Sequence, residues 1–226
     1  MKPGLALVVA AACGRIAFDA TSNVTSDAPI GDGRARDGTG VTFEDGPGVG
    51  CSSDAFASAP PCTGWGTVIA TAATVSQANG LTIAPNANDA TAIGGCLHAA
   101  TAFGAGGVFA DVGQLLTQGD TAIAITGAGV TFTMSAANGT VVGMSEPGQV
   151  SVPLFLYDAS ADRYWRMRPS GGFVAYETSP DASTWTLHYT STNAAPATVS
   201  IELDAQTPAA EPAPGTAIFR AITACP

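Results

Sequence analysis

The chain has 226 residues, of which 46% are hydrophobic and only 12% charged, and it is rich in glycine (27) and proline (15). Helix surfaces exposed to water need Glu, Lys and Arg, so this composition argues against a helical protein and favours short strands joined by turns. The net charge of -10 argues against nucleic acid and anionic membrane surfaces as partners, because phosphate binding needs clustered Lys and Arg. We interpret the acidity as a contribution to solubility.

Residues 1–13 have the layout of an export signal, with one positive charge at Lys2, a short apolar run and then Cys13. The run is too short to cross a membrane, which takes about 20 apolar residues. The segment Ala10–Cys13 resembles a bacterial lipobox, in which the cysteine becomes the acylated N-terminus, although Ala10 stands where Leu is usual. We therefore expect Cys13 to be lipidated. An ordinary A-x-A cleavage site and an uncleaved leader remain as alternatives.

Residues 14–50 have the composition of a flexible linker. Apolar residues occur singly there, so ordering the segment would bury too little surface to offset its chain entropy. Its acids beside glycines, such as Asp32, Asp37 and Asp45, match no EF-hand spacing. A lipidated Cys13 followed by this linker predicts an exported protein of the outer membrane or cell surface, which touches the membrane only through its lipid anchor. Without the lipid, the protein is expected outside the cell.

The chain has five cysteines, an odd number for an exported protein. Lipidation of Cys13 leaves four that can pair, as expected in an oxidising compartment. Four cysteines allow three connectivities. Proximity along the chain favours Cys51–Cys62, which leaves Cys96–Cys225.

From residue 51 to 226 the chain shows short apolar segments punctuated by Gly, Asn, Asp or Pro, and we see no internal repeat. Segments at roughly 8–12-residue spacing with turn signals predict an all-β sandwich or barrel. Residues 114–118 are the one candidate for a helical turn. The segments that we predict as strands are 67–75, 80–84, 95–99, 107–112, 121–126, 130–134, 139–144, 151–157, 164–168, 173–178, 184–190, 199–204 and 216–223.

Alternation within a strand predicts which side chains face a core. In the segment 199–204, Val199, Ile201 and Leu203 are predicted to point inward, and Ser200, Glu202 and Asp204 outward. In the last segment, we expect Ile218 and Ile222 on one face and Phe219 on the other. A strand that is apolar on both faces indicates an interior position in a sheet.

The densest pattern runs from Asp162 to Thr190, where three predicted strands are joined by two turns. In the first strand, Trp165 and Met167 share one face, opposite Tyr164, Arg166 and Arg168. The turn at 169–172 contains two glycines, and Pro and Asp mark the turn at 179–183. In the third strand, Trp185, Leu187 and Tyr189 are predicted to share a face.

The order and spacing of these segments resemble the C-terminal half of concanavalin A-like lectin/glucanase modules. The matching segments are 163–168, 176–185 and 215–219, with 80–85 and 107–112 resembling earlier strands, so the resemblance covers about residues 51–226. It implies a jelly-roll sandwich of two antiparallel sheets. Residues 179–185 also resemble an Asp-box hairpin that is one residue short. In such hairpins the Asp and Trp are structural, which implies a role in the fold for Asp181 and Trp185.

The glucanase branch of this superfamily carries a Glu-x-Asp-x-Glu strand, because retaining hydrolysis needs two carboxylates about 5–5.5 Å apart. This chain has no such strand. Glu202 and Asp204 have the spacing of a pair on one strand face, but they lack the third acid, and we interpret them as a solvated edge. The sequence also contains no Gly-x-Ser-x-Gly elbow and no P-loop. We therefore expect no enzymatic activity.

We expect no metal and no cofactor. The two histidines, His98 and His188, have no ligand spacing to cysteines or carboxylates. A calcium site built from Asp158, Asp162 or Asp181 is the weaker alternative.

The remaining candidate for function is a carbohydrate site, because sugars are commonly bound by aromatic faces together with polar and charged groups. The candidate ligand-binding residues are Tyr164, Arg166, Arg168, Tyr176, Glu177 and His188. In the alternative, the aromatics cover the core and the arginines pair with nearby acids, since fold does not imply function. The sequence thus predicts an exported, monomeric, non-catalytic module that binds or adheres to glycans or another envelope polymer. A glycoside-type hydrolase and a structural envelope lipoprotein are the rival functions.

Overall fold

The computed structural model describes residues 50–57 and 60–226, and all regular structure in them is β-strand. Within these ranges no helix has the length and apolarity needed to cross a membrane. The predicted export signal, the lipidation site at Cys13 and nearly all of the predicted linker at 14–50 lie outside the described residues.

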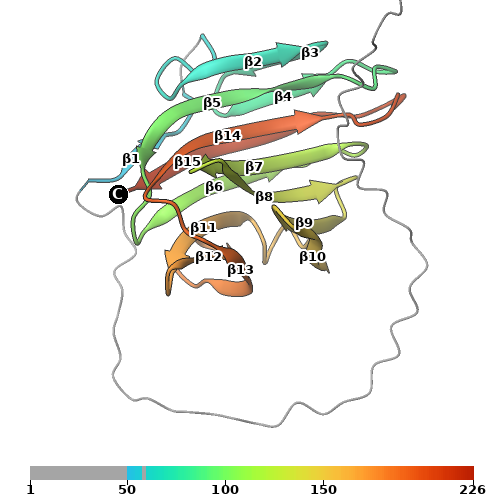
Figure 1. Ribbon diagram of the computed structural model, residues 1–226. Helices are drawn as coiled ribbons and strands as arrows, with labels where there is room; N and C mark the ends of the chain where they lie inside the picture. The colour runs from blue at the N-terminus through green and yellow to red at the C-terminus, as the bar shows by residue number, and fades with distance from the viewer. Residues whose placement is uncertain (1–49, 58–59) are drawn as a thin grey trace, which may run out of the picture. The chain divides into compact units, whose positions relative to one another are not determined.

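The strands form two antiparallel sheets, as Figure 1 shows and as the sequence predicted. The eight-stranded sheet has the order β13-β12-β11-β6-β15-β4-β3, with β1 paired to β15. Its strands are β1 (Ser52–Asp54), β3 (Ala73–Gln77), β4 (Leu81–Pro85), β6 (Gly107–Gln114), β11 (Tyr164–Ser170), β12 (Phe173–Ser179), β13 (Thr186–Ala194) and β15 (Ala217–Cys225). The seven-stranded sheet has the order β10-β9-β8-β7-β14-β5-β2. Its strands are β2 (Thr67–Thr71), β5 (Ile93–Ala102), β7 (Asp120–Gly127), β8 (Val130–Ala137), β9 (Val141–Glu146), β10 (Gln149–Leu156) and β14 (Thr198–Gln206).

One hydrophobic core fills the space between the two sheets. Trp165 and Met167 enter it from β11, and Val199, Ile201 and Leu203 enter it from β14. Each of these side chains is at most 1% exposed, and they sit at alternate positions along their strands. The inward faces predicted for these two strands are therefore confirmed, because burial between stacked sheets selects every second residue.

The single strand predicted over residues 67–75 is two strands in different sheets. Ala72 has a positive φ of 47°, a left-handed conformation that ends the extended chain between β2 and β3. The chain therefore passes from one sheet to the other at this residue. The helical turn predicted at 114–118 is absent from the described residues, and Leu115 and Leu116 pack into the core instead.

The last strand does not split its apolar residues as predicted. The pairing of β15 with β6 shifts register between Ile218 and Phe219 and again between Phe219 and Ala221. A register shift changes the face on which the following residues lie. Phe219 and Ile222 both end up fully buried, while Ile218 is half-buried.

The disulfides join Cys51 to Cys225 and Cys62 to Cys96, so the predicted pairs Cys51–Cys62 and Cys96–Cys225 are wrong. Strand pairing decides the partners. β1 runs antiparallel to β15 with Ser52 opposite Ala224, which brings the cysteines flanking these residues together. Proximity in the sequence does not predict this disulfide, because Cys51 and Cys225 are 174 residues apart along the chain. Two disulfides indicate an oxidising environment outside the cytoplasm.

Peptide mapping without reduction is expected to recover the fragment containing Cys51 covalently joined to the C-terminal fragment containing Cys225. A second linked pair should contain Cys62 and Cys96. The physical reason is that disulfides form only between cysteines whose Cα atoms approach to within about 7 Å. A fragment in which Cys51 is joined to Cys62 would contradict the strand pairing of β1 with β15.

Candidate functional site

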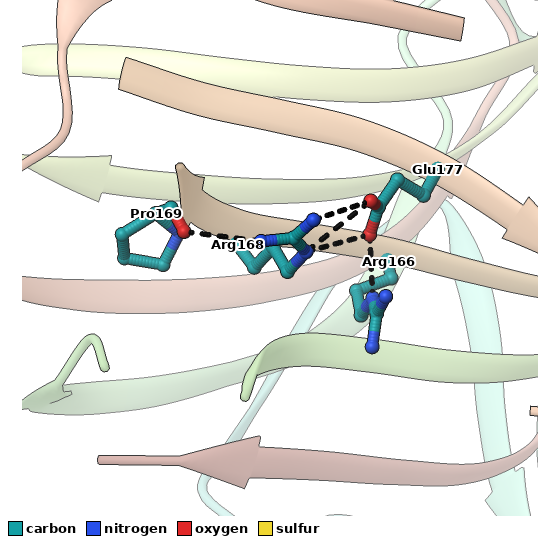
Figure 2. Close-up of polar contacts among 4 residues, drawn as sticks. All are labelled: Arg166, Arg168, Pro169 and Glu177. Carbon is teal, nitrogen blue, oxygen red and sulfur yellow. Dashed lines mark hydrogen bonds and ion pairs between the residues drawn. The ribbon is translucent and has the colours of Figure 1, made fainter. Parts of the chain in front are cut away.

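Three of the six predicted ligand-binding residues form an ion network on the outer face of the eight-stranded sheet (Figure 2). Glu177 on β12 lies directly opposite Arg166 on β11. Its Oε2 accepts hydrogen bonds from Nε of Arg166 at 2.6 Å and from Nε of Arg168 at 3.0 Å. Nη2 of Arg168 donates to Oε1 of the same carboxylate at 2.9 Å. The arginines therefore pair with a nearby acid, as the alternative to a sugar site predicted.

The ring of Trp185 packs against the guanidinium of Arg166 in this network. The guanidinium carbon of Arg166 lies 3.9 Å from the Trp185 ring centroid, and the ring also contacts Phe109 edge-on. The hairpin that carries Trp185 is held by Asp181, whose Oδ1 accepts from the backbone N–H groups of Ser183 and Thr184 at 2.9 Å. These backbone hydrogen bonds hold the pKa of Asp181 well below its usual range. The contacts agree with the structural roles implied for Asp181 and Trp185.

Tyr176 and His188 do not share the outer face with the arginines. Tyr176 is fully buried between the sheets, and its hydroxyl donates to the backbone oxygen of Ser145 in the opposite sheet. His188 stacks on Phe155 of β10 at 4.0 Å, and its Nε2 lies 2.7 Å from Oγ1 of Thr178. Burial lowers the pKa of His188. The six predicted residues therefore do not form one surface.

A second ion network lies beside the first. The carboxylate of Asp111 on β6 accepts two hydrogen bonds from Arg163 and lies 3.6 Å from Nη1 of Arg220. Tyr164, the sixth predicted residue, lies opposite Asp111 and under the Arg163 guanidinium. Residues 50–57 and 60–226 contain four arginines. Three of them lie in strands of the eight-stranded sheet, and Arg163 directly precedes β11 of the same sheet.

The seven-stranded sheet carries acids instead. On β14, Glu202 and Asp204 point away from the core, because the alternate residues Ile201 and Leu203 point into it. β14 is an interior strand that lies between β7 and β5, so the prediction that the two acids mark a solvated edge is wrong. Asp204 is only 6% exposed, although it was predicted to face solvent.

A third acid completes a row on this face. Asp120 on β7 is directly opposite Gln206, which follows Asp204 on the same face of β14. Cross-strand partners share a face, so Asp120, Glu202 and Asp204 all project from the outer side of the sheet. The residues opposite Asp204 are Gly95 and Ala122, and Ala124 lies opposite Glu202. The acids therefore have small residues as cross-strand neighbours on β5 and β7.

No positive charge compensates these acids within the described residues. Burial raises the pKa of Asp204 well above its usual range, and the charges of Glu202 and Asp120 raise it further. Burial also raises the pKa of Glu202 and of Asp120. Oδ1 of Asp204 is buried and has no hydrogen-bond partner. A buried carboxyl oxygen without a hydrogen-bond donor is unfavourable to folding when the group is ionised.

A groove of about 340 Å³ lies on the seven-stranded sheet. Its walls are Trp65, Gly66, Thr67, Leu97, His98, Ala99 and Ser200. Leu97 is directly opposite Glu202 on one side and Thr67 on the other, so the groove opens on the same face as the carboxylates. Trp65 and His98 stack at 4.1 Å and form a rigid wall. A larger hollow of about 460 Å³ beside Leu115 and Tyr157 contains no acid and no cation.

The described residues hold no group of three or more His, Cys, Asp or Glu side chains placed to bind one metal ion. The carboxylates of Asp158 and Asp162, which were candidates for a calcium site, accept hydrogen bonds from nearby residues instead. Asp158 accepts from the N–H of Ser160, and Asp162 accepts from the N–H of Asp158 and the hydroxyl of Thr178.

Replacement of Asp204 by Asn is expected to stabilise the domain by about 1–3 kcal/mol at a pH where the carboxyl is ionised, because the amide carries no charge and Oδ1 of Asp204 is buried without a hydrogen-bond partner. The folded pKa of Asp204 is raised, so the folded state binds a proton more tightly than the unfolded chain. The contribution of Asp204 to stability is then greatest at and below about pH 4 and is lost as the pH rises through the folded pKa. Urea unfolding at several pH values measures both effects. Glu211→Gln, in the loop between β14 and β15, is the matched control, and a less stable Asp204→Asn at about pH 8 would contradict the assignment.

Comparison with known proteins identifies the fold. No protein-family model and no curated protein sequence matches the chain. The solved structure of an apo Crh5 transglycosylase is similar, with a TM-score of 0.54 and 10% identity over 79% of this chain and 85% of that one. A prokaryotic β-1,3-1,4-glucanase (lichenase) derived from a mouse hindgut metagenome gives 0.51 at 11% identity, covering 78% of this chain and 99% of that one.

The domain is a concanavalin A-like sandwich. A Bacillus licheniformis β-glucanase supports this, with a TM-score of 0.51 and 9% identity over 78% of this chain and 98% of the enzyme. At such low identity the likeness shows the fold of this concanavalin A-like domain alone.

The sequence did not lead us to the acid face or the groove. Glu202 and Asp204 were visible as a pair, but nothing local showed that β14 is a central strand. The position of Trp65, three residues after Cys62 at the start of the domain, is the one sequence feature that could have pointed to the groove. Nothing in the sequence could have indicated Asp120, because it meets β14 only by pairing with Gln206, which lies 86 residues further along the chain.

Proposed function

We propose that the chain is an exported surface protein whose sandwich binds glycans, without turnover, through the outer face of the seven-stranded sheet. The observation that carries this proposal is the groove lined by Leu97, Thr67 and Ser200 on the outer face of this sheet. Sugar rings present both apolar C–H faces and hydroxyls. Leu97 is 38% exposed and offers an apolar wall, while Thr67 and Ser200 offer hydroxyls.

The fold is consistent with this proposal. The similar structures are named as a transglycosylase and as glucanases, and those proteins act on carbohydrate. The predicted lipid anchor at Cys13 would hold the module at the cell surface. Mass spectrometry of the mature N-terminus tests the anchor, and an unmodified Cys13 would remove it from the proposal.

A glycan array on the purified full chain tests binding. We expect Leu97→Asp to weaken the binding of an array hit by about tenfold, because a charge enters the apolar wall. Leu187→Asp is the matched control, since Leu187 is a leucine 56% exposed on β13 of the other sheet. Binding to no glycan, or equal loss in both variants, would overturn the proposal.

Glycoside hydrolysis is the second candidate, and the position of Glu202 and Asp204 favours it. Both lie on one face of a central strand with raised pKa values, which a general acid needs. Their Cα atoms are separated by two residues of strand, about 7 Å. Release of reducing sugar from a β-glucan that is abolished by Glu202→Gln, with binding retained, would replace the non-catalytic proposal. A purely structural envelope protein predicts neither binding nor release.

A further inference from the structure

The groove on the seven-stranded sheet lies at an irregularity in the strand pairing. The pairing of β14 with β5 shifts register between Val199 and Ile201, because β5 has one extra residue between His98 and Thr101. Such a β-bulge bends its strand and redirects nearby side chains, and bulges are over-represented next to active sites. His98 and Ser200, which lie at this bulge, both line the groove. The groove is therefore formed by the pairing of two neighbouring strands.

One ring nitrogen of His98 is held by the chain, and the other is available to a ligand. Nδ1 hydrogen-bonds the backbone oxygen of Trp65, and since a carbonyl oxygen can only accept, Nδ1 carries the hydrogen. In the neutral imidazole Nε2 is then an acceptor. Nε2 has no hydrogen-bond partner within the described residues and is not one of their buried unpartnered atoms, so it is accessible to solvent. The stack of the ring on Trp65 limits its orientation.

Two hydroxyl groups add further acceptors to the groove. Oγ1 of Thr67 donates to the backbone oxygen of Leu97 at 3.4 Å, and Oγ of Ser200 donates to that of Thr126 at 3.3 Å. Each hydroxyl hydrogen is used within the chain, so each oxygen offers a ligand only its lone pairs. None of the described residues that line the groove is a lysine, arginine, aspartate or glutamate. The groove thus presents acceptors beside the apolar side chain of Leu97.

This arrangement fits a ligand that donates hydrogen bonds and carries no negative charge. The hydroxyl groups of an uncharged sugar donate in this way, and its C–H faces suit Leu97. An ionised carboxylate has no hydrogen to donate, and the lone pairs of His98 and Thr67 would face its own. The net charge of -10 on the whole chain also disfavours polyanionic glycans.

On the basis of the glycan-binding function proposed above, we infer that the groove selects uncharged glycans with free hydroxyl groups and that His98 is its specificity-determining residue. Nε2 of His98 accepts a hydrogen bond from one sugar hydroxyl, and the oxygens of Thr67 and Ser200 accept from others. Leu97 contacts the face of the ring. A site that hydrogen-bonds a hydroxyl rejects an analogue that lacks it, because its acceptors then lose water and gain no partner.

The test compares three β-1,4-linked hexasaccharides by titration calorimetry on the full chain at about pH 8, above the range in which histidines usually gain a proton. They are the glucose hexamer, its fully O-methylated form and the glucuronic acid hexamer. Methylation removes every hydroxyl hydrogen, and glucuronic acid adds a carboxylate to each ring. We expect the glucose hexamer to bind about tenfold more tightly than either of the others.

His98→Phe should remove most of the preference for the glucose hexamer over its methylated form, and leave the affinity for the methylated form unchanged. The substitution removes the acceptor but keeps an aromatic ring against Trp65. His188→Phe is the matched control, because it makes the same exchange on the other sheet, where the ring stacks on Phe155. Thr67→Val is a second test variant, which removes one acceptor from β2 and keeps a β-branched side chain in the strand.

Equal affinity of the wild type for the glucose hexamer and either of the other two would overturn the inference and leave glycan binding intact. A preference that survives both His98→Phe and Thr67→Val, or that falls equally in His188→Phe, would also overturn it. Binding of charged glycans alone on the array would contradict this inference only. Binding of no glycan would overturn the glycan-binding function itself.

Discussion

Replacement of Glu177 by Ala is expected to lower the free energy of unfolding by about 3–5 kcal/mol. Glu177 is 3% exposed and is the acceptor shared by two arginines. The Arg166 side chain is itself only 8% exposed, so the substitution removes a charged acceptor from a buried guanidinium that cannot be solvated easily. Removing one partner of a buried ion pair is more unfavourable than replacing both.

Urea unfolding followed by tryptophan fluorescence measures this loss. The double variant Arg166→Met with Glu177→Leu is expected to recover a large part of it, because no buried charge remains. Glu211→Ala removes an acid from a loop and should change the stability by no more than about 0.5 kcal/mol. If Glu177→Ala lost less than about 1 kcal/mol, the network would be a solvated surface pair rather than a buried one.

Glu146 is expected to make the domain sensitive to acid. Its carboxylate, at the end of β9, accepts hydrogen bonds from the hydroxyl of Tyr189 and from backbone and side-chain donors of Thr192 and Asn193 in β13. Burial raises its pKa, but these donors outweigh burial and lower the pKa to about 2. The carboxylate therefore links the two sheets most strongly when it is ionised.

The sign of the pH effect follows from this lowered pKa. The unfolded chain takes up the proton at about pH 4.5, before the folded state does, so the stabilisation is complete above that pH. It is lost as the pH falls from about 5 towards 2, and its size is about 3 kcal/mol. Glu146→Gln should lack this contribution at neutral pH and show a flatter decline in acid. Thermal unfolding between about pH 2 and 7 measures both, and parallel acid profiles of wild type and Glu146→Gln would refute it.

Local patterns in the sequence predicted much of the fold. Alternation along the segment at 164–168 correctly placed Trp165 and Met167 in the core, because the faces of a strand depend only on local backbone geometry. The same reasoning failed at β15, where register shifts moved Ile222 to the face of Phe219. Such shifts arise from pairing with β6, a partner about 100 residues away, and leave no local signal.

The candidate site was predictable only in part. The arginines at 166 and 168 were recognised as a cluster, and the structure shows the acid that pairs with them. Tyr176 was assigned to the same surface, but its place on β12 opposite Met167 turns it into the core. The sequence shows Glu202 and Asp204 as a pair on one strand face but does not predict that β14 is an interior strand, since nothing in a strand's own sequence identifies its neighbours in the sheet.

By itself the sequence determined that the domain is an antiparallel sandwich, because turn residues and alternating apolar residues act within a few positions of one another. It also determined that the chain is acidic and carries paired cysteines suited to an oxidising compartment. The tertiary structure alone decided which cysteines join, which strands lie at the centre, and that the arginines and the unpaired acids occupy opposite sheets. These properties depend on contacts between distant segments, whose partners are selected by the burial of the whole core rather than by any local preference.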